Sequence, residues 1–203
     1  MMRAASPPLL FYIRHGETDW NVESRLQGQH DIPINARGRE QARHSGAILG
    51  DLLSRDGIAA ASLDFVASPL GRARETMALV RATLGLDPTG YRVDPRLAEV
   101  SFGSWEGFTS AELRTHFPDL NAAREADKWG FTPPAGESYA TASLRMRAWY
   151  DALTRDTVAV AHGGTLRGLV VQLGIATWDN APFLEVSQGV VYVIQPGNIA
   201  RYA

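Results

Sequence analysis

The sequence lacks cysteine, has almost no net charge and contains no long apolar run. Without cysteine, disulfide bonds, thiolate catalysis and cysteine-ligated metal sites are excluded. The formal net charge is −2 over 203 residues, and acidic and basic residues are mixed along the chain. No basic tract of the kind that binds nucleic acid or a membrane surface is present, so any strongly positive site must be local. We expect neither a nucleic-acid nor a membrane partner.

The apolar segments are also informative about location. None approaches the length of a membrane span, and residues 1–8 lack the apolar core of a signal peptide. These features predict a cytoplasmic protein. The length suits one α/β domain over residues 1–203, and a homodimer is compatible with the sequence.

Two short apolar segments end in the same way. Residues 9–13 lead directly into Arg14 and His15, and residues 157–161 lead into His162. Continuous apolar runs of this length are typical of buried parallel strands. Either histidine alone is typical of a structural polar group at a strand end. The pair instead indicates a site, because ligands bind at the carboxyl ends of strands in open α/β sheets.

A third apolar segment, residues 63–67, contributes another cation. We predict that Ser68 caps the following helix, with Pro69 in its first position and Arg72 in its first turn. The free backbone N–H groups at a helix start favour anions. Cations and histidines from three strand ends would therefore form an anion pocket.

The remaining pattern predicts an α/β three-layer sandwich with a mostly parallel central sheet and one antiparallel edge strand. Further strands are expected at residues 91–97, 184–186 and 190–194. Helices are expected at residues 36–54, 139–154 and 163–173, the first capped by Asn35. Residues 98–138, rich in glycine, proline and aromatic residues, predict a lid-like helical insertion. Its aromatic side chains either face the site or pack the insertion onto the body.

Five motifs stand in order along the chain. They are Arg14-His15-Gly16-Glu17-Thr18 with Asn21, Arg25-Leu26-Gln27-Gly28, Ser68-Pro69-Leu70 with Arg72-Ala73-Arg74-Glu75-Thr76, Glu99 with Phe102-Gly103 and Trp105-Glu106-Gly107, and Ala161-His162-Gly163. Together they resemble the histidine phosphatase superfamily, in its phosphoglycerate-mutase-like branch, over nearly the whole chain. The resemblance implies a phosphatase that acts on small phosphorylated metabolites without a metal or another cofactor.

The resemblance also implies roles for individual residues. His15 would be the nucleophile that forms a phosphohistidine, His162 would donate to the phosphoryl oxygens, and Glu99 would be the acid and base. The substrate-binding residues would be Arg14, Asn21, Gln27, Gly28, Arg72 and Gly163. From the residues alone, Glu99 cannot be chosen over the other glutamates near these motifs, which are Glu17, Glu106 and Glu137.

Three alternatives accompany this interpretation. A phosphoglycerate mutase would usually carry Glu-Arg-His-Tyr-Gly where residues 99–103 read Glu-Val-Ser-Phe-Gly, so the side chains expected to hold a glycerate carboxylate are missing. His15, His162 and Glu99 have the composition of a two-His, one-carboxylate metal site, but two arginines in the same pocket would repel a dication. A catalytically silent ligand-binding module of the same fold is the third alternative.

Overall fold

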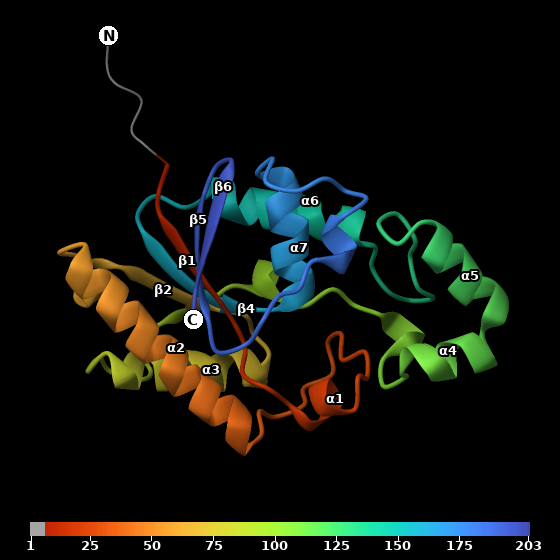
Figure 1. Cartoon of the computed structure of the whole chain (residues 1–203), viewed down its shortest axis with the longest axis horizontal. Helices are drawn as coiled ribbons and strands as arrows, with labels where there is room; N and C mark the ends of the chain where they lie inside the picture. Colours follow the sequence, from red (N-terminus) through yellow and green to blue (C-terminus); the bar gives the residue numbers. More distant parts are fainter. Residues whose placement is uncertain (1–6) are drawn as a thin grey trace, which may run out of the picture.

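The computed structural model describes residues 7–203, which form a six-stranded sheet in the order β3-β2-β4-β1-β5-β6 (Figure 1). The strands are β1 (Leu10–Arg14), β2 (Asp64–Ala67), β3 (Arg92–Val93), β4 (Thr157–Ala161), β5 (Val191–Gln195) and β6 (Asn198–Tyr202). The strands from β1 to β4 are parallel, β5 pairs antiparallel with β1, and β6 pairs antiparallel with β5. This confirms the mostly parallel sheet with an antiparallel edge.

The register of β1 and β4 brings the two histidine segments together. Arg14 pairs with Ala161 at the last position of both strands, and the next backbone group, His15 N–H, donates to the Ala161 carbonyl oxygen over 3.0 Å. Both strands are buried, as their continuous apolar character predicts. His15 and His162 therefore leave the sheet at the same carboxyl edge.

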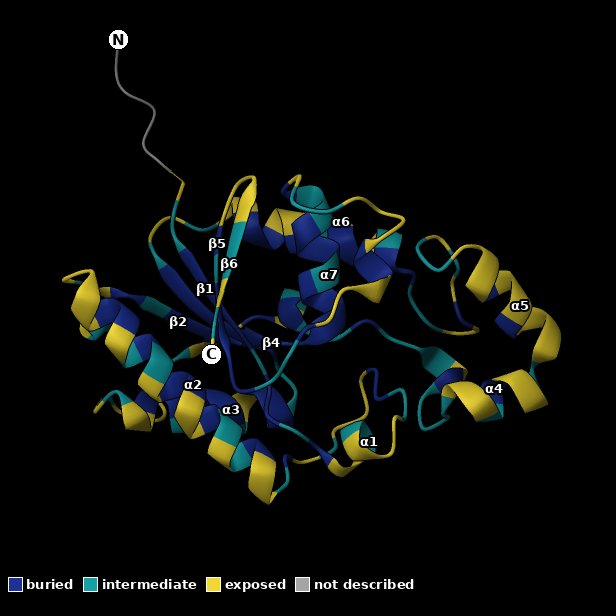
Figure 2. Ribbon diagram, in the orientation of Figure 1, coloured by how far each residue is buried: buried dark blue, intermediate teal, exposed yellow. Residues whose placement is uncertain are grey.

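Two helices cover each face of the sheet, giving three layers (Figure 1). On one face lie α2 (Ala36–Arg55) and α3 (Gly71–Thr83), and on the other lie α6 (Tyr139–Asp151) and α7 (Gly163–Gln172). Residues of β1 alternate between the two cores: Leu10 and Tyr12 pack toward α6 and α7, whereas Phe11 and Ile13 pack toward α2 and α3. The strands are buried and the outer side of α2 is exposed, as Figure 2 shows.

The predicted helix starts follow from local capping. The Asn35 side chain accepts from Gly38 N–H over 2.9 Å at the start of α2, and the Ser138 side chain accepts from Thr141 N–H over 3.1 Å at the start of α6. A side-chain oxygen at this position satisfies a backbone donor that the helix itself leaves free.

Three local predictions were wrong. Only residues 92 and 93 of the expected strand 91–97 pair, because Asp94 accepts from Arg96 N–H and turns the chain into a 3-10 helix at Pro95–Leu97. Residues 184–186 form no strand. Helix α3 begins at Gly71, so Ser68 is not its cap, and Asp31 from a distant loop accepts from Gly71 N–H over 2.7 Å instead.

The insertion contains α4 (Ser110–His116) and α5 (Pro118–Ala126), which project to one side of the sheet (Figure 1). The buried Trp105 ring stacks on Phe131 and Phe117 with centroid distances of 5.3 and 6.4 Å. These aromatics thus pack within the insertion, while a lid motion of residues 98–138 stays a prediction. None of the helices between residues 7 and 203 has the length and apolar character that crossing a membrane requires.

Candidate active site

The two histidines lie against each other at the carboxyl edge of the sheet. Their ring centroids are 5.1 Å apart, and His15 and His162 are 2% and 0% exposed. His15 Nδ1 is 2.8 Å from the Gly16 carbonyl oxygen. Because a carbonyl only accepts, this hydrogen bond puts the ring proton on Nδ1 and leaves Nε2 with a free lone pair.

Both imidazoles are held in the neutral form. Burial, followed by the Arg14 and Arg72 guanidiniums, lowers the pKa of His15 well below its usual value. Burial, followed by Arg72 and His15, does the same to the pKa of His162. A cation is disfavoured in this place both by desolvation and by like charges. A neutral ring with an unprotonated Nε2 is the form in which His15 is nucleophilic.

Arg14 and Arg72 are fixed by backbone carbonyl oxygens. Arg14 Nη1 donates to Val186 over 2.7 Å, and Arg72 Nη2 donates to Gly28 over 2.7 Å while its Nη1 donates to His30. The buried Nε atoms of both arginines have no hydrogen-bond partner within residues 7–203. Burial lowers the pKa of both guanidiniums. Two buried cations with unsatisfied donors are suited to a phosphoryl group.

Ser68 and Tyr12 hold His162 in place. His162 Nε2 shares a hydrogen bond of 2.7 Å with Ser68 Oγ, while Nδ1 has no partner in the described chain. Tyr12 Oη donates to the His162 carbonyl oxygen over 2.7 Å and accepts from His162 N–H over 3.0 Å. Burial raises the pKa of Tyr12, so it stays a phenol. The sequence analysis missed both roles, although a hydroxyl in an otherwise apolar strand was a signal for Tyr12.

The loop after β1 brings Gln27 and Gly28 to the same place. Gln27 is 7% exposed and its Oε1 has no partner within residues 7–203. Gly28 has φ +49°, and a Cβ there would overlap the Glu106 carboxylate. Glu106 accepts from Gln29 N–H over 3.0 Å and pairs with His30 Nδ1 at 2.7 Å, so it anchors this loop. A side chain at Gly28 would break that arrangement.

Asn21 is oriented by three donors. Its Oδ1 accepts from Thr18 N–H over 3.1 Å, from the Thr18 hydroxyl over 3.2 Å and from the Gln188 side-chain amide over 3.0 Å. With the oxygen engaged in this way, the Asn21 amide nitrogen is the group left to donate toward a ligand.

The Glu99 carboxylate rests on the start of α7. Its Oε1 accepts from Val100 N–H over 2.8 Å and Thr165 N–H over 3.2 Å, and its Oε2 accepts from Gly164 N–H over 3.1 Å. Three backbone N–H groups thus fix the position of the carboxyl group, which lines the same cavity as His15.

The other three candidate carboxylates have different partners. Glu106 anchors the Gly28 loop, Glu137 pairs with Arg145 at 2.8 Å, and Glu17 accepts from Asn35 Nδ2 over 3.2 Å. None of the three lines the cavity beside His15, whereas Glu99 does.

This active-site cavity has a volume of about 240 Å³. Most of the predicted site residues line it: Arg14, His15, Asn21, Gln27, Gly28, Arg72 and Glu99. His162 is not among the lining residues, although its ring centroid is 5.1 Å from that of His15, and Gly164 lines the cavity in place of Gly163. A Cβ built on Gly163 would lie 3.7 Å from Arg14 Nε, an ordinary van der Waals contact, so Gly163 lies beside this arginine.

Arginines that the sequence analysis did not assign also line the cavity. Arg124 comes from α5 and Arg167 from α7, and Arg25 is already paired with Glu23 and Glu112. A Cβ on Gly163 would lie 3.4 Å from Arg167 Nη1, and Arg167 also contributes to lowering the pKa of Arg14. Their positions follow from tertiary packing, although the four-residue spacing between Gly163 and Arg167 on a predicted helix was a signal.

No three His, Asp or Glu side chains of residues 7–203 come together as a metal-binding group. The Arg14 and Arg72 guanidiniums beside His15 fit an anion instead.

Residues 10–199 match the family model of the histidine phosphatase superfamily, branch 1. The chain is 34% identical to glucosyl-3-phosphoglycerate phosphatase of Mycobacterium tuberculosis over 83% of this chain and 78% of that protein. It is 31% identical to a 2,3-bisphosphoglycerate-dependent phosphoglycerate mutase of Methylobacterium radiotolerans over 91% and 88% of the two chains. The crystal structure of an alpha-ribazole phosphatase from Shigella flexneri superposes with a TM-score of 0.78 at 28% identity, covering 92% of this chain and 90% of the other.

Proposed function

Because the chain belongs to branch 1 of the histidine phosphatase superfamily, we propose that it hydrolyses phosphate monoesters of small metabolites through a phosphohistidine on His15. One observation carries this proposal. A neutral, buried His15 with a free Nε2 faces a cavity into which two buried guanidiniums bring unpartnered donors. Similar relatives that are named phosphatases support the same reaction class.

In the first step, Arg14 and Arg72 bind the phosphoryl oxygens and His15 Nε2 attacks phosphorus. The P–N bond forms as the P–O bond to the leaving group breaks. Ser68 donates to His162 Nε2, which puts the second imidazole proton on Nδ1, and this N–H donates to a phosphoryl oxygen. Such preorganised donors are commonly worth about a hundred- to a thousand-fold in rate.

Glu99 carries the proton in both steps. As a carboxylic acid it protonates the leaving alkoxide, and as a carboxylate it then takes a proton from the water that attacks the phosphohistidine. That attack breaks the P–N bond, restores neutral His15 and releases inorganic phosphate. The hydrogen bonds from Gly164 and Thr165 N–H, which fix the carboxyl group beside the cavity, support this role.

We further propose that the preferred substrates carry a second anionic group. Arg124 and Arg167 line the same cavity outside the Arg14 and Arg72 pair, and Arg167 keeps Nη1 beside the helix start. Phosphorylated carboxylates fit this charge distribution. A mutase reaction is less well supported, because Phe102 lines the cavity within the 99–103 loop that lacks the arginine and tyrosine usual in mutases.

The test is a panel of phosphomonoesters assayed in EDTA with the purified protein. We expect phosphate release from several of them, and no turnover of any across acidic to neutral pH would overturn the proposal in favour of a silent module. With 3-phosphoglycerate and a trace of 2,3-bisphosphoglycerate, phosphate release should exceed formation of 2-phosphoglycerate. Rapid isomerisation without phosphate release would support the mutase alternative. The cytoplasmic location and the homodimer stay predictions.

A further inference from the structure

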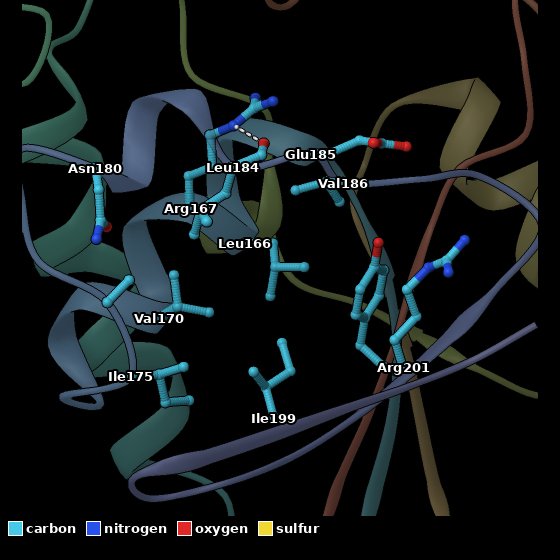
Figure 3. Close-up of a pocket in the computed structure, with 12 residues that line it drawn as sticks. Leu166, Arg167, Val170, Ile175, Asn180, Leu184, Glu185, Val186, Ile199 and Arg201 are labelled. Atoms are coloured by element: carbon cyan, nitrogen blue, oxygen red, sulfur yellow. Dashed lines mark hydrogen bonds between the residues drawn. The ribbon is translucent and has the colours of Figure 1, made fainter.

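A second cavity, of about 300 Å³, lies against α7 and is lined by residues other than the catalytic groups (Figure 3). Its walls come from α7, from the β5–β6 hairpin and from the segment 175–186. The lining residues are Leu166, Arg167, Val170, Ile175, Ala176, Asn180, Leu184, Glu185, Val186, Tyr192, Ile199 and Arg201. This apolar cavity is separate from the active-site cavity, and within the described chain Arg167 is the one residue that lines both.

The apolar cavity opens directly onto the hydrophobic core. Leu166, Val170 and Val186 are buried core residues, and Ile175 and Ile199 pack against them. In Figure 3 these side chains surround one common space. The volume is about ten times the ~30 Å³ that a water molecule occupies in the liquid. Carbon surface around a space of this size has few partners for water, and such a cavity is typical of a site for the apolar part of a small ligand.

The charged groups at the cavity favour an anion. Arg167 and Arg201 line it, and Glu185 is the single acidic residue among the lining residues. Arg167 Nε already donates to the Leu184 carbonyl oxygen over 3.0 Å, and Glu185 accepts from Ser187 Oγ over 2.8 Å. Arg201 is exposed on β6 beside the apolar walls. An occupant with an apolar body and a single anionic head would therefore complement both the walls and the net positive charge.

We propose that this apolar cavity binds a small amphipathic anion, namely a medium-length alkyl carboxylate such as decanoate, whose apolar chain suits the carbon-lined walls. The chain lies among Leu166, Val170 and Ile199, and the carboxylate pairs with Arg201. Arg167 is shared with the active-site cavity, and none of the other residues that line the apolar cavity belongs to the proposed catalytic set.

The cavity is nevertheless connected to the active site through one backbone group. Val186 forms part of its wall, and the Val186 carbonyl oxygen accepts from Arg14 Nη1 over 2.7 Å. A ligand packed on Val186 holds this segment where it positions Arg14. Binding of the carboxylate and binding of an oxyanion beside His15 should therefore strengthen each other by the same factor.

The experiment is isothermal titration of the purified protein with decanoate while saturating vanadate occupies the active site. Vanadate excludes decanoate from the Arg14 and Arg72 pair, so binding that is retained or tightened supports the proposal. Arg201→Gln should weaken decanoate binding roughly three- to ten-fold, as expected for one partly exposed charge-assisted pair, and leave decan-1-ol binding unchanged. Ile199→Trp should fill the space and abolish binding of both.

Matched controls are Arg43→Gln and Val93→Trp, which place the same changes on exposed positions far from the cavity, and both should bind decanoate like the parent chain. Circular dichroism of Ile199→Trp verifies its fold, and Arg201→Gln gives an independent result if that variant is unstable. Displacement of decanoate by vanadate, or equal affinity in a folded Ile199→Trp, would overturn the proposal. A third outcome would also overturn it: the parent chain does not bind decanoate, and Ile199→Trp changes the oligomeric state. That outcome would assign the cavity to contact with a second copy of the chain.

Discussion

The two sides of α7 present different chemistry although they belong to the same ten-residue helix. Toward the histidines, Gly164 and Arg167 line a cavity whose buried donors lack partners. Toward the β5–β6 hairpin, Leu166 and Val170 line a cavity bounded by core carbon atoms. The first arrangement depends on charge and unsatisfied hydrogen bonds, whereas the second depends mainly on an apolar volume, with Arg201 as the proposed partner of one carboxylate. Substitutions on the first side should therefore change the reaction, and those on the second should change binding of a different molecule.

The strongest test of the polar side is His15→Ala. It removes the proposed phosphoryl acceptor, so turnover should fall by at least about ten-thousand-fold, as for loss of other enzymes' nucleophiles. No acid-labile phosphoenzyme should form when the variant is mixed with substrate and quenched. His44→Ala, a histidine of α2 outside both cavities, is the matched control and should keep parent activity. A phosphoenzyme in the His15 variant would assign the nucleophile to another residue.

Glu99→Gln should have the next largest effect. With an alkyl phosphate the rate should fall by roughly a hundred- to ten-thousand-fold, because both proton transfers are lost. With p-nitrophenyl phosphate, whose leaving group needs no proton, phosphorylation should survive better than dephosphorylation, giving a burst of nitrophenolate followed by slow turnover. The exposed Glu40→Gln is the control. Equal losses for both substrates without a burst would show that Glu99 is not the proton carrier.

Arg167→Gln tests the polar side of α7 at the residue that lines both cavities. We expect kcat/KM for 3-phosphoglycerate to fall by about ten-fold, the effect of one charged hydrogen bond, with a smaller loss for glycerol 3-phosphate, which lacks the carboxylate. Steady-state kinetics on the two substrates measures this ratio. The exposed Arg74→Gln should leave it unchanged. Equal losses on both substrates would remove the support for a second anionic group.

The smallest effect concerns stability against pH. Because the pKa values of His15 and His162 are lowered in the folded chain, the unfolded chain binds more protons once the pH falls below the ordinary histidine value. The free energy of unfolding should then decrease by up to about 1.4 kcal/mol per pH unit for each histidine, until the folded pKa is reached. Urea unfolding at several pH values tests this. His162→Gln should flatten the dependence, whereas His44→Gln should not; an unchanged slope in His162→Gln would contradict the buried neutral state.

The sequence predicted the features that depend on residues adjacent along the chain. The apolar runs that end at Arg14 and His162 needed only burial and strand pairing, and parallel register then placed them together. Ser68 was assigned to a helix start because its propensity there is high, but Asp31 provides that cap from forty residues away and leaves the serine to His162. A cap that comes from a residue far away in the sequence cannot be predicted from the few residues around the helix start.

The parts of the site that the sequence did not predict also depend on contacts between segments that are far apart in the sequence. Arg124 reaches the cavity only because the insertion packs its aromatic residues among themselves and sets the position of α5. The apolar cavity combines α7, the hairpin and the segment 175–186, and no periodicity in any one of them indicates it. Residues 184–186 were predicted as a strand from their apolar character, whereas Val186 forms part of that cavity wall and holds Arg14.

Arg14 and Arg72 are both held by main-chain carbonyl oxygens. A residue presents this oxygen whatever its side chain is. Arg14 donates to the Val186 carbonyl, and Arg72 donates to the carbonyls of Gly28 and His30. Apart from Gly28, where a Cβ would overlap Glu106, the side chains at these positions can therefore vary as long as the backbone path is kept. In a mutant library, randomised side chains at Leu184 and Glu185 should yield many active clones, whereas insertions or deletions in the same loop should yield few, because they displace the carbonyl that Arg14 requires.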